Sequence, residues 1–151
     1  MSVGKAQKSK NTGPELAVRQ ALRGLGIHGY RVHQRVVLPN FRNKPQHTTP
    51  DIVFNTQMVA IFVDGDHWHG CLEHYRETRT NTAMWRKKVA TARARDQRHS
   101  RYLSSIGWRV FRVWECQDAL AAAKAIQAII ETSAVPGIYG LPIPPVVGTD
   151  Y

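Results

Sequence analysis

The segment from Phe62 to Cys71 holds an unusual density of side chains that take part in chemistry. Two histidines, His67 and His69, flank Trp68 within it. An imidazole titrates near neutral pH and suits a general base that takes a proton from water. Hydrogen bonding within a loop explains such histidines equally well, so their types and spacing leave both roles open.

Asp51 is a second candidate, because a buried strand has little reason to begin with a carboxylate. Two apolar runs, 51–54 and 58–63, are separated by Asn-Thr-Gln and predict a hairpin with Asp51 opposite Ile61 to Val63. Phosphodiester cleavage needs a hard cation, and Mg²⁺ prefers oxygen ligands. Asp51 and the strand end at 62–64 can supply them, although Pro-Asp is also a common turn dipeptide.

Cys71-x-x-His74 has the spacing of half a zinc site. Cys116 lies 45 residues after Cys71, at the end of a predicted strand. A zinc ion bound by these residues would tie the loop after Val63 to that strand. Two buried free thiols, or loss of the metal, are the alternatives.

The elements that position these residues follow from hydrophobic spacing. Thr12-x-x-Glu15 fits a capping box and predicts a first helix that ends near Gly26. Alternation predicts a strand over 30–38, and a loop rich in Pro, Asn and Arg follows over 39–50, before the hairpin.

Spacings of three and four residues predict a long helix from about Asn81 to Ile106, ended by Gly107. Asp96 and His99 interrupt its apolar stripe, and a buried carboxylate there needs a partner. A strand over 108–114 and a last helix capped by Asp118 complete the pattern.

The resulting order is α-β-β-β-α-β-α, which predicts one α/β domain over 1–132 with a mixed central sheet flanked by helices. A basic arm (1–11) precedes it, and 133–151 is expected to be a loosely packed Pro/Gly-rich tail.

Charge indicates the partner. The chain has 21 Lys and Arg against 11 Asp and Glu, a net charge of +10. Residues 86–112 carry nine basic residues and one acid, whereas 51–77 hold five of the eleven acids and one base. An acidic segment within a basic chain indicates a cation site that faces a phosphate backbone.

The longest apolar run, Met58 to Val63, is too short to span a bilayer, and the N-terminus lacks the apolar region of a secretory signal, so we expect a reducing cytosol.

Six motifs in order carry a resemblance to a known family: Ser9–Glu15, Pro50–Phe54, Val59–Cys71, Thr80-Asn81 with Trp85, Arg95-Asp96 and Gly107–Cys116. The set resembles the very-short-patch-repair (Vsr) mismatch endonucleases of the PD-(D/E)xK nuclease superfamily. The resemblance implies a restriction-endonuclease-like core and a DNA enzyme that nicks the strand 5′ to the thymine of a T:G mismatch left by deamination of 5-methylcytosine.

The resemblance also implies roles for individual residues. Asp51 matches the carboxylate that holds catalytic Mg²⁺, helped by the backbone carbonyl of Val63, and His69 matches the base that activates water. Asp64 stands where the best-known members carry a histidine, and it could serve as a second metal ligand. Two further acids, Glu15 and Asp96, match the edge of the family's active centre, with the helix cap as the alternative role of Glu15.

Aromatic wedges are the family's other device, because side chains that enter the base stack detect a mismatch. Trp68 and Trp85 match the wedge positions, although Trp85 also fits the core stripe of its helix. His67 occupies a position that is usually aromatic. We further expect DNA contacts from four basic residues: Lys8, Lys10, Arg86 and Lys87.

Members often complete a structural zinc site with a cysteine where this chain has Asp66, which would then join Cys71, His74 and Cys116 as ligands. We expect a monomer in a bacterial-type cytoplasm, associated with the nucleoid, with T:G duplex DNA as substrate and mismatch-repair proteins as candidate partners. The alternatives are a restriction or defence nuclease on the same fold and a catalytically silent basic DNA-binding module.

Overall fold

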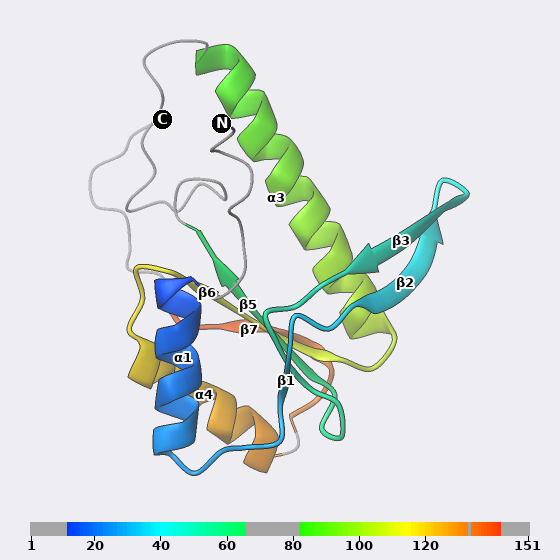
Figure 1. Cartoon of the computed structure of the whole chain (residues 1–151). Helices are drawn as coiled ribbons and strands as arrows, with labels where there is room; N and C mark the ends of the chain where they lie inside the picture. The colour runs from blue at the N-terminus through cyan, green and yellow to red at the C-terminus, as the bar shows by residue number, and fades with distance from the viewer. Residues whose placement is uncertain (1–11, 66–81, 133, 143–151) are drawn as a thin grey trace.

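A mixed five-stranded sheet forms the centre of the computed structural model, which describes residues 12–65, 82–132 and 134–142 (Figure 1). The strand order is β1-β4-β5-β6-β7. The bounds are α1 Gly13–Gly24, β1 Arg31–Val32, β2 Val36–Phe41, β3 Lys44–Thr48, β4 Ile52–Phe54, β5 Val59–Asp64, α3 Thr82–Ser105, β6 Arg109–Trp114, α4 Ala119–Glu131 and β7 Gly137–Gly140. The predicted α/β class with a mixed sheet is confirmed.

Helices cover both faces of this sheet. Alternate residues of β5 point to opposite sides: Val59 and Ile61 pack with α1 and α4, whereas Ala60 and Phe62 pack with Leu103 of α3. Figure 1 shows α1 and α4 together on one side and α3 on the other. In the described part of the chain, no helix is long and apolar enough to cross a membrane.

The strand pairings place both ends of the hairpin as predicted. β4 and β5 are antiparallel, with Ile52 opposite Ile61 and Phe54 opposite Val59. β6 then lies parallel to β5, and α3 forms the crossover between them. The predicted helices are confirmed as α1, α3 and α4, and Gly107 follows α3 with a φ of +102°, which a residue with a side chain rarely adopts.

The prediction of a single strand over 30–38 was wrong. The backbone bends at His33, whose φ is +52°, so β1 joins the central sheet while β2 leaves it. The prediction of a loop over 39–50 was also wrong, because β2 and β3 form a separate two-stranded sheet. Its two-residue turn, Arg42-Asn43, has positive φ at both positions but lacks the Asn-Gly pair that signals such a turn.

The C-terminal segment differs from expectation as well. Residues 137–140 form β7, which pairs parallel with β6 at the edge of the central sheet. The described part of the segment predicted to be a loose tail therefore belongs to the fold. Its glycines and proline concealed the strand, because such residues are depleted in strand interiors.

Arg109 is a buried tie between two layers. Its Nη1 donates to the carbonyl of Ile129 in α4 at 2.5 Å, and its Nη2 donates to the carbonyl of Gln57 in the β4–β5 turn at 2.6 Å. Arg109 belongs to the basic segment 86–112, but its guanidinium is buried and hydrogen-bonded to backbone carbonyls, so it does not add to the basic surface.

We predict that Arg109→Met lowers the free energy of unfolding by about 2–4 kcal/mol, because two buried carbonyls would lose charged donors. Chemical denaturation would measure the loss. Arg101→Met, which removes an exposed arginine from α3, is the control and should change stability by less than about 0.5 kcal/mol. Equal effects of the two substitutions would show that the Arg109 contacts contribute nothing.

Candidate active site

Asp51 lies just before β4, against the end of β5. Its backbone N–H donates to the carbonyl of Ile61 at 2.9 Å, and its Oδ2 accepts from the N–H of Val63 at 2.7 Å. These bonds confirm the predicted register, in which Asp51 faces residues 61 to 63. The side chain is therefore fixed at the sheet end, beside the backbone of Val63.

Three ligand-type side chains from distant segments meet there. Glu15 comes from the first turn of α1, His33 from the bend after β1, and Asp51 from the start of β4. One ligand atom from each lies within 4.8 Å of the others. His33 was missed by the sequence analysis, because it has no ligand motif around it and enters the cluster only through the bend that ends β1.

Glu15 turns toward this cluster and away from its helix. Thr12 Oγ1 accepts from the Glu15 N–H at 3.4 Å, so one half of the predicted capping box is present. The Glu15 carboxylate is 1% exposed, and its Oε2 lies 2.8 Å from His33 Nε2 and 3.5 Å from Arg19 Nη1. Glu15 thus contributes to the cluster as well as to the helix start.

The donor set fits a divalent cation. Both carboxylate oxygens of Glu15 and His33 Nε2 are buried and make no hydrogen bond with the described residues, although Glu15 Oε2 lies within ion-pair distance of His33 Nε2 and Arg19 Nη1. Two ligands of one ion lie at most about 4–5 Å apart, given bonds of about 2.0–2.6 Å. The spacing within the cluster meets this limit, and an ion would coordinate buried ligand atoms that make no hydrogen bond with the described residues.

The raised pKa of the Asp51 carboxyl also fits a cation site. The pKa of Asp51 is raised from 3.8 to about 7, mainly by burial and also by the nearby charges of Glu15 and Asp64, while the Val63 N–H and His33 oppose the shift. A carboxylate held this close to other acids is unfavourable when ionised. A bound cation would remove that penalty.

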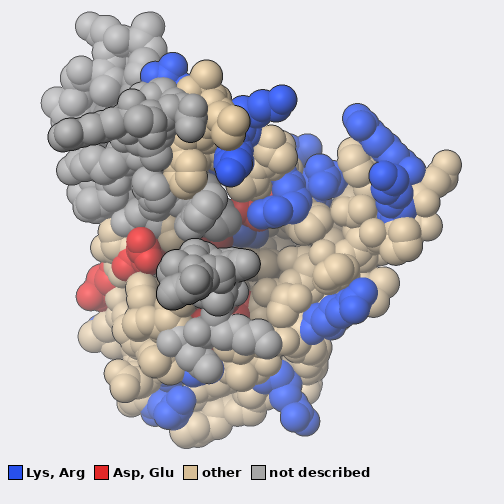
Figure 2. Space-filling view, turned by 45° about the horizontal axis from the view of Figure 1, so that its top comes forward, with Lys and Arg blue, Asp and Glu red and all other residues tan. Residues whose placement is uncertain are grey.

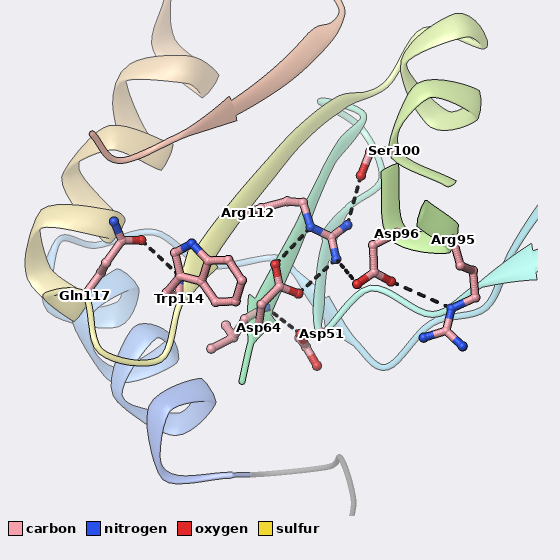
Figure 3. Close-up of polar contacts among 9 residues, drawn as sticks. Asp51, Asp64, Arg95, Asp96, Ser100, Arg112, Trp114 and Gln117 are labelled. Carbon is pink, nitrogen blue, oxygen red and sulfur yellow. Dashed lines mark hydrogen bonds and ion pairs between the residues drawn. The ribbon is translucent and has the colours of Figure 1, made fainter. Parts of the chain in front are cut away.

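A guanidinium beside the cluster joins three elements. Arg112 of β6 donates through Nε and Nη2 to both carboxylate oxygens of Asp64, each at 2.9 Å, and through Nη1 to Ser100 of α3 at 2.9 Å. Its Nη2 also lies 3.6 Å from Asp96 Oδ2. Figure 3 shows Arg112 between Asp64 and Asp96, with Asp51 next to Asp64.

These contacts qualify the predicted roles of the two acids. Asp96 has the charged partner that its place on an apolar stripe required. Asp64 is 8% exposed and binds Arg112 with both oxygens, and it is not part of the cluster of Glu15, His33 and Asp51. Its use as a second metal ligand stays a prediction, which would require exchange of at least one Arg112 bond.

Many of the basic side chains lie on α3 and on the β2–β3 hairpin. Figure 2 shows Lys and Arg along α3 and on the β2–β3 hairpin. Those on α3 include Arg86, Lys87, Lys88, Arg93 and Arg101, all exposed. Asp96 and Ser100 of the same helix contact Arg112, which links the basic helix to the sheet end at Asp64.

Comparisons with known proteins give the family. A family model described as DNA mismatch endonuclease Vsr matches residues 2–77. The Type II nicking enzyme V.NaeI of Lentzea aerocolonigenes is 40% identical over 120 residues, which cover 78% of this chain and 69% of the relative. V.XorIIP of Xanthomonas oryzae is 40% identical over 131 residues (83% and 88%), and DNA mismatch endonuclease Vsr of Escherichia coli is 32% identical over 123 residues (74% and 71%).

The chain belongs to the Vsr family. It is therefore a DNA endonuclease, and the cluster of Glu15, His33 and Asp51 at the sheet end is the candidate active site of this Vsr-family chain. The expected family resemblance is confirmed.

Several predicted site residues of this Vsr-family chain lie outside the described residues: Lys8, Lys10, Asp66, His67, Trp68, His69, Cys71 and His74. Trp85 is partly exposed in the first turn of α3, and Arg86 and Lys87 next to it are exposed. Cys116 is exposed in the turn after β6. The zinc site, the general base and the wedge at Trp68 stay predictions.

We predict that metal-free protein loses stability as pH rises from about 4 to about 7. The folded state holds the Asp51 proton up to a pKa near 7, whereas the unfolded state releases it near 3.8. The native state therefore binds more protons in this window, and stability falls with pH by at most about 4 kcal/mol before it levels off.

Denaturation across this pH range in a chelator would measure the effect against Asp51→Asn, which has no proton to release. The difference in stability between the two proteins should change through the window and be constant above it. A difference that is the same at pH 4 and pH 8 would contradict the buried, perturbed Asp51.

Proposed function

We propose that this chain nicks one strand of duplex DNA 5′ to the thymine of a T:G mismatch, with a divalent cation, expected to be Mg²⁺, at Asp51. The cluster of Glu15, His33 and Asp51 carries the proposal, because its ligand atoms lie within 4.8 Å of one another and those of Glu15 and His33 are buried without hydrogen bonds from the described residues. Family membership and relatives named as nicking enzymes support a single-strand cut.

Asp51 would hold the ion together with the backbone carbonyl of Val63, and Glu15 and His33 complete the set from the other side. When bound, the cation polarises the scissile phosphate and lowers the pKa of an attacking water. Carboxylates suit Mg²⁺ or Mn²⁺, whereas an imidazole suits transition metals better, so His33 extends the range of ions that the site accepts.

The remaining groups would accept the proton of the attacking water or hold the other side chains in position. His69 would accept the proton from the attacking water, as its family position implies. Arg112 keeps Asp64 close to Asp51 and ties Asp96 of α3 to the same sheet end. This arrangement would hold the basic helix next to the phosphate that is cut.

Recognition of the mismatch would come from aromatic side chains that enter the stack beside the weakly paired bases. Trp68 and Trp85 are the proposed wedges, with His67 beside them, and unstacking costs least where the pairing is already wrong. Arg86 and Lys87, exposed next to Trp85, are suited to hold the backbone there.

A restriction or defence nuclease with another target is the second candidate. The relatives named as Type II nicking enzymes favour it, since that name does not mention a mismatch. A catalytically silent DNA-binding module is less well supported, because charge alone would not require a buried acidic cluster.

We predict that Asp51→Ala lowers the nicking rate by about a hundredfold or more and leaves DNA affinity largely intact, since phosphate contacts elsewhere dominate binding. His33→Ala should raise the metal concentration needed for half-maximal activity about 10- to 100-fold and recover in excess Mg²⁺ or Mn²⁺. Rates would be measured on a labelled T:G duplex over a metal titration.

The matched control is His28→Ala, which removes an exposed histidine from the loop after α1. It should leave the metal dependence unchanged. Full activity of Asp51→Ala, or a metal titration of His33→Ala that matches the control, would remove that residue from the metal site.

We also predict that a T:G duplex is nicked once, in the thymine strand, while a matched T:A duplex survives at equal salt and protein concentration. Strand-specific end labels would report each cut, with Asp51→Ala as the blank. Cleavage of both strands of the matched or 5-methylcytosine-containing duplex, without enrichment at T:G, would overturn the repair assignment in favour of the restriction relative.

A further inference from the structure

The β2–β3 hairpin projects from the body of the protein (Figure 1) and is not part of the central sheet. Its inward face is anchored by two buried residues, Leu38 and Thr48. The opposite face is open to solvent, and Val37 on it is 74% exposed. Packing against the core therefore explains the base of the hairpin, but it gives no reason for the outer half to extend into solvent.

The outer half is nevertheless held in place on α3. The guanidinium of Arg98 stacks on the Phe41 ring at 4.3 Å, and that of Arg42 lies over the same ring at 5.0 Å. His99 Nε2 lies 3.4 Å from Gln46 Oε1. Burial and the neighbouring arginines, Arg98 first, lower the pKa of His99.

The exposed side chains of the hairpin match the chemistry of DNA. Residues 36–48 contain no acid, and the tip presents Arg42, Asn43 and Lys44, with Asn40 exposed beside it. Arginine and lysine bind guanine edges, and asparagine binds adenine edges. A two-stranded ribbon also fits the B-DNA major groove, which is about 12 Å wide.

The hairpin is connected to the candidate site through α3. His99, which contacts Gln46, is followed by Ser100, whose hydroxyl accepts from Arg112, and Arg112 binds Asp64 beside Asp51. A duplex bound at the site and along the basic face of α3 would continue toward the hairpin. The hairpin would then meet base pairs that flank the cut.

We propose that the β2–β3 hairpin lies in the major groove of the duplex beside the cleaved phosphate and determines which flanking sequence is nicked. This proposal rests on the endonuclease function and adds the element that reads sequence. It needs neither the T:G assignment nor the metal site to be correct.

The test uses binding selection, so that it is independent of cleavage. Full-length protein carrying Asp51→Asn would select from duplexes with a central T:G pair and randomised flanks, and the bound pool would be sequenced. In a second protein, residues 39–45 are replaced by Asn-Gly, which joins Leu38 to Gln46 through a two-residue turn and keeps the buried base. Enrichment of flanking bases on one side should disappear in this protein.

A third protein carries Arg42→Gln and Lys44→Gln. Its affinity should fall about tenfold or more at 0.15 M salt, and the slope of log affinity against log salt should decrease by about two, because two cationic side chains would no longer displace counterions from the duplex. Enrichment of flanking bases should weaken as well. The control, Arg23→Gln with Lys124→Gln, removes two exposed charges from α1 and α4 and should change neither quantity.

Unchanged flank enrichment in both hairpin variants would overturn the proposal, even if affinity falls, because the hairpin would then contribute charge alone. If the shortened hairpin prevents folding, as judged by thermal unfolding, the Arg42 and Lys44 variant decides by its enrichment. Failure of the T:G assignment would appear separately. The protein with the unmodified hairpin would then bind duplexes with a matched and a mismatched central pair equally well.

Discussion

One guanidinium joins α3 to the end of the sheet, beside the apolar packing of Leu103. Arg112 binds both oxygens of Asp64, the hydroxyl of Ser100 and, at longer distance, the carboxylate of Asp96. Asp64 is buried and Arg112 is partly buried, so removing one partner would leave a poorly solvated charge without its counterpart. The basic face of α3, and the hairpin that packs on it, therefore keep a fixed relation to the sheet end where Asp51 lies.

The acidic cluster is unfavourable for the metal-free fold, and this property suits it to a cation. Burial and the charges of Glu15 and Asp64 raise the pKa of Asp51, while Glu15 and His33 keep ligand atoms without hydrogen bonds from the described residues. A folded chain tolerates such a site because the surrounding core supplies the stability. Binding energy from an ion then becomes folding energy as well.

The sequence alone determined much of the framework, because local rules govern it. Side chains alternate with a period of two in a strand, so two apolar runs and a three-residue gap were enough to place Asp51 opposite Val63. Helix α3 followed from its spacing, and the Asp118 cap of α4 followed from its residue type. The family also followed from motifs in order, since they keep both residue types and spacing.

Tertiary structure alone decided which charges meet. His33 joins Glu15 and Asp51 because the chain bends between β1 and β2, and Arg109 and Arg112 point inward although their segment looks like a basic surface. Strands β3 and β7 formed despite prolines and glycines, because pairing partners far along the chain supplied their hydrogen bonds. Such contacts depend on packing between segments distant in sequence, which neither periodicity nor local propensity specifies.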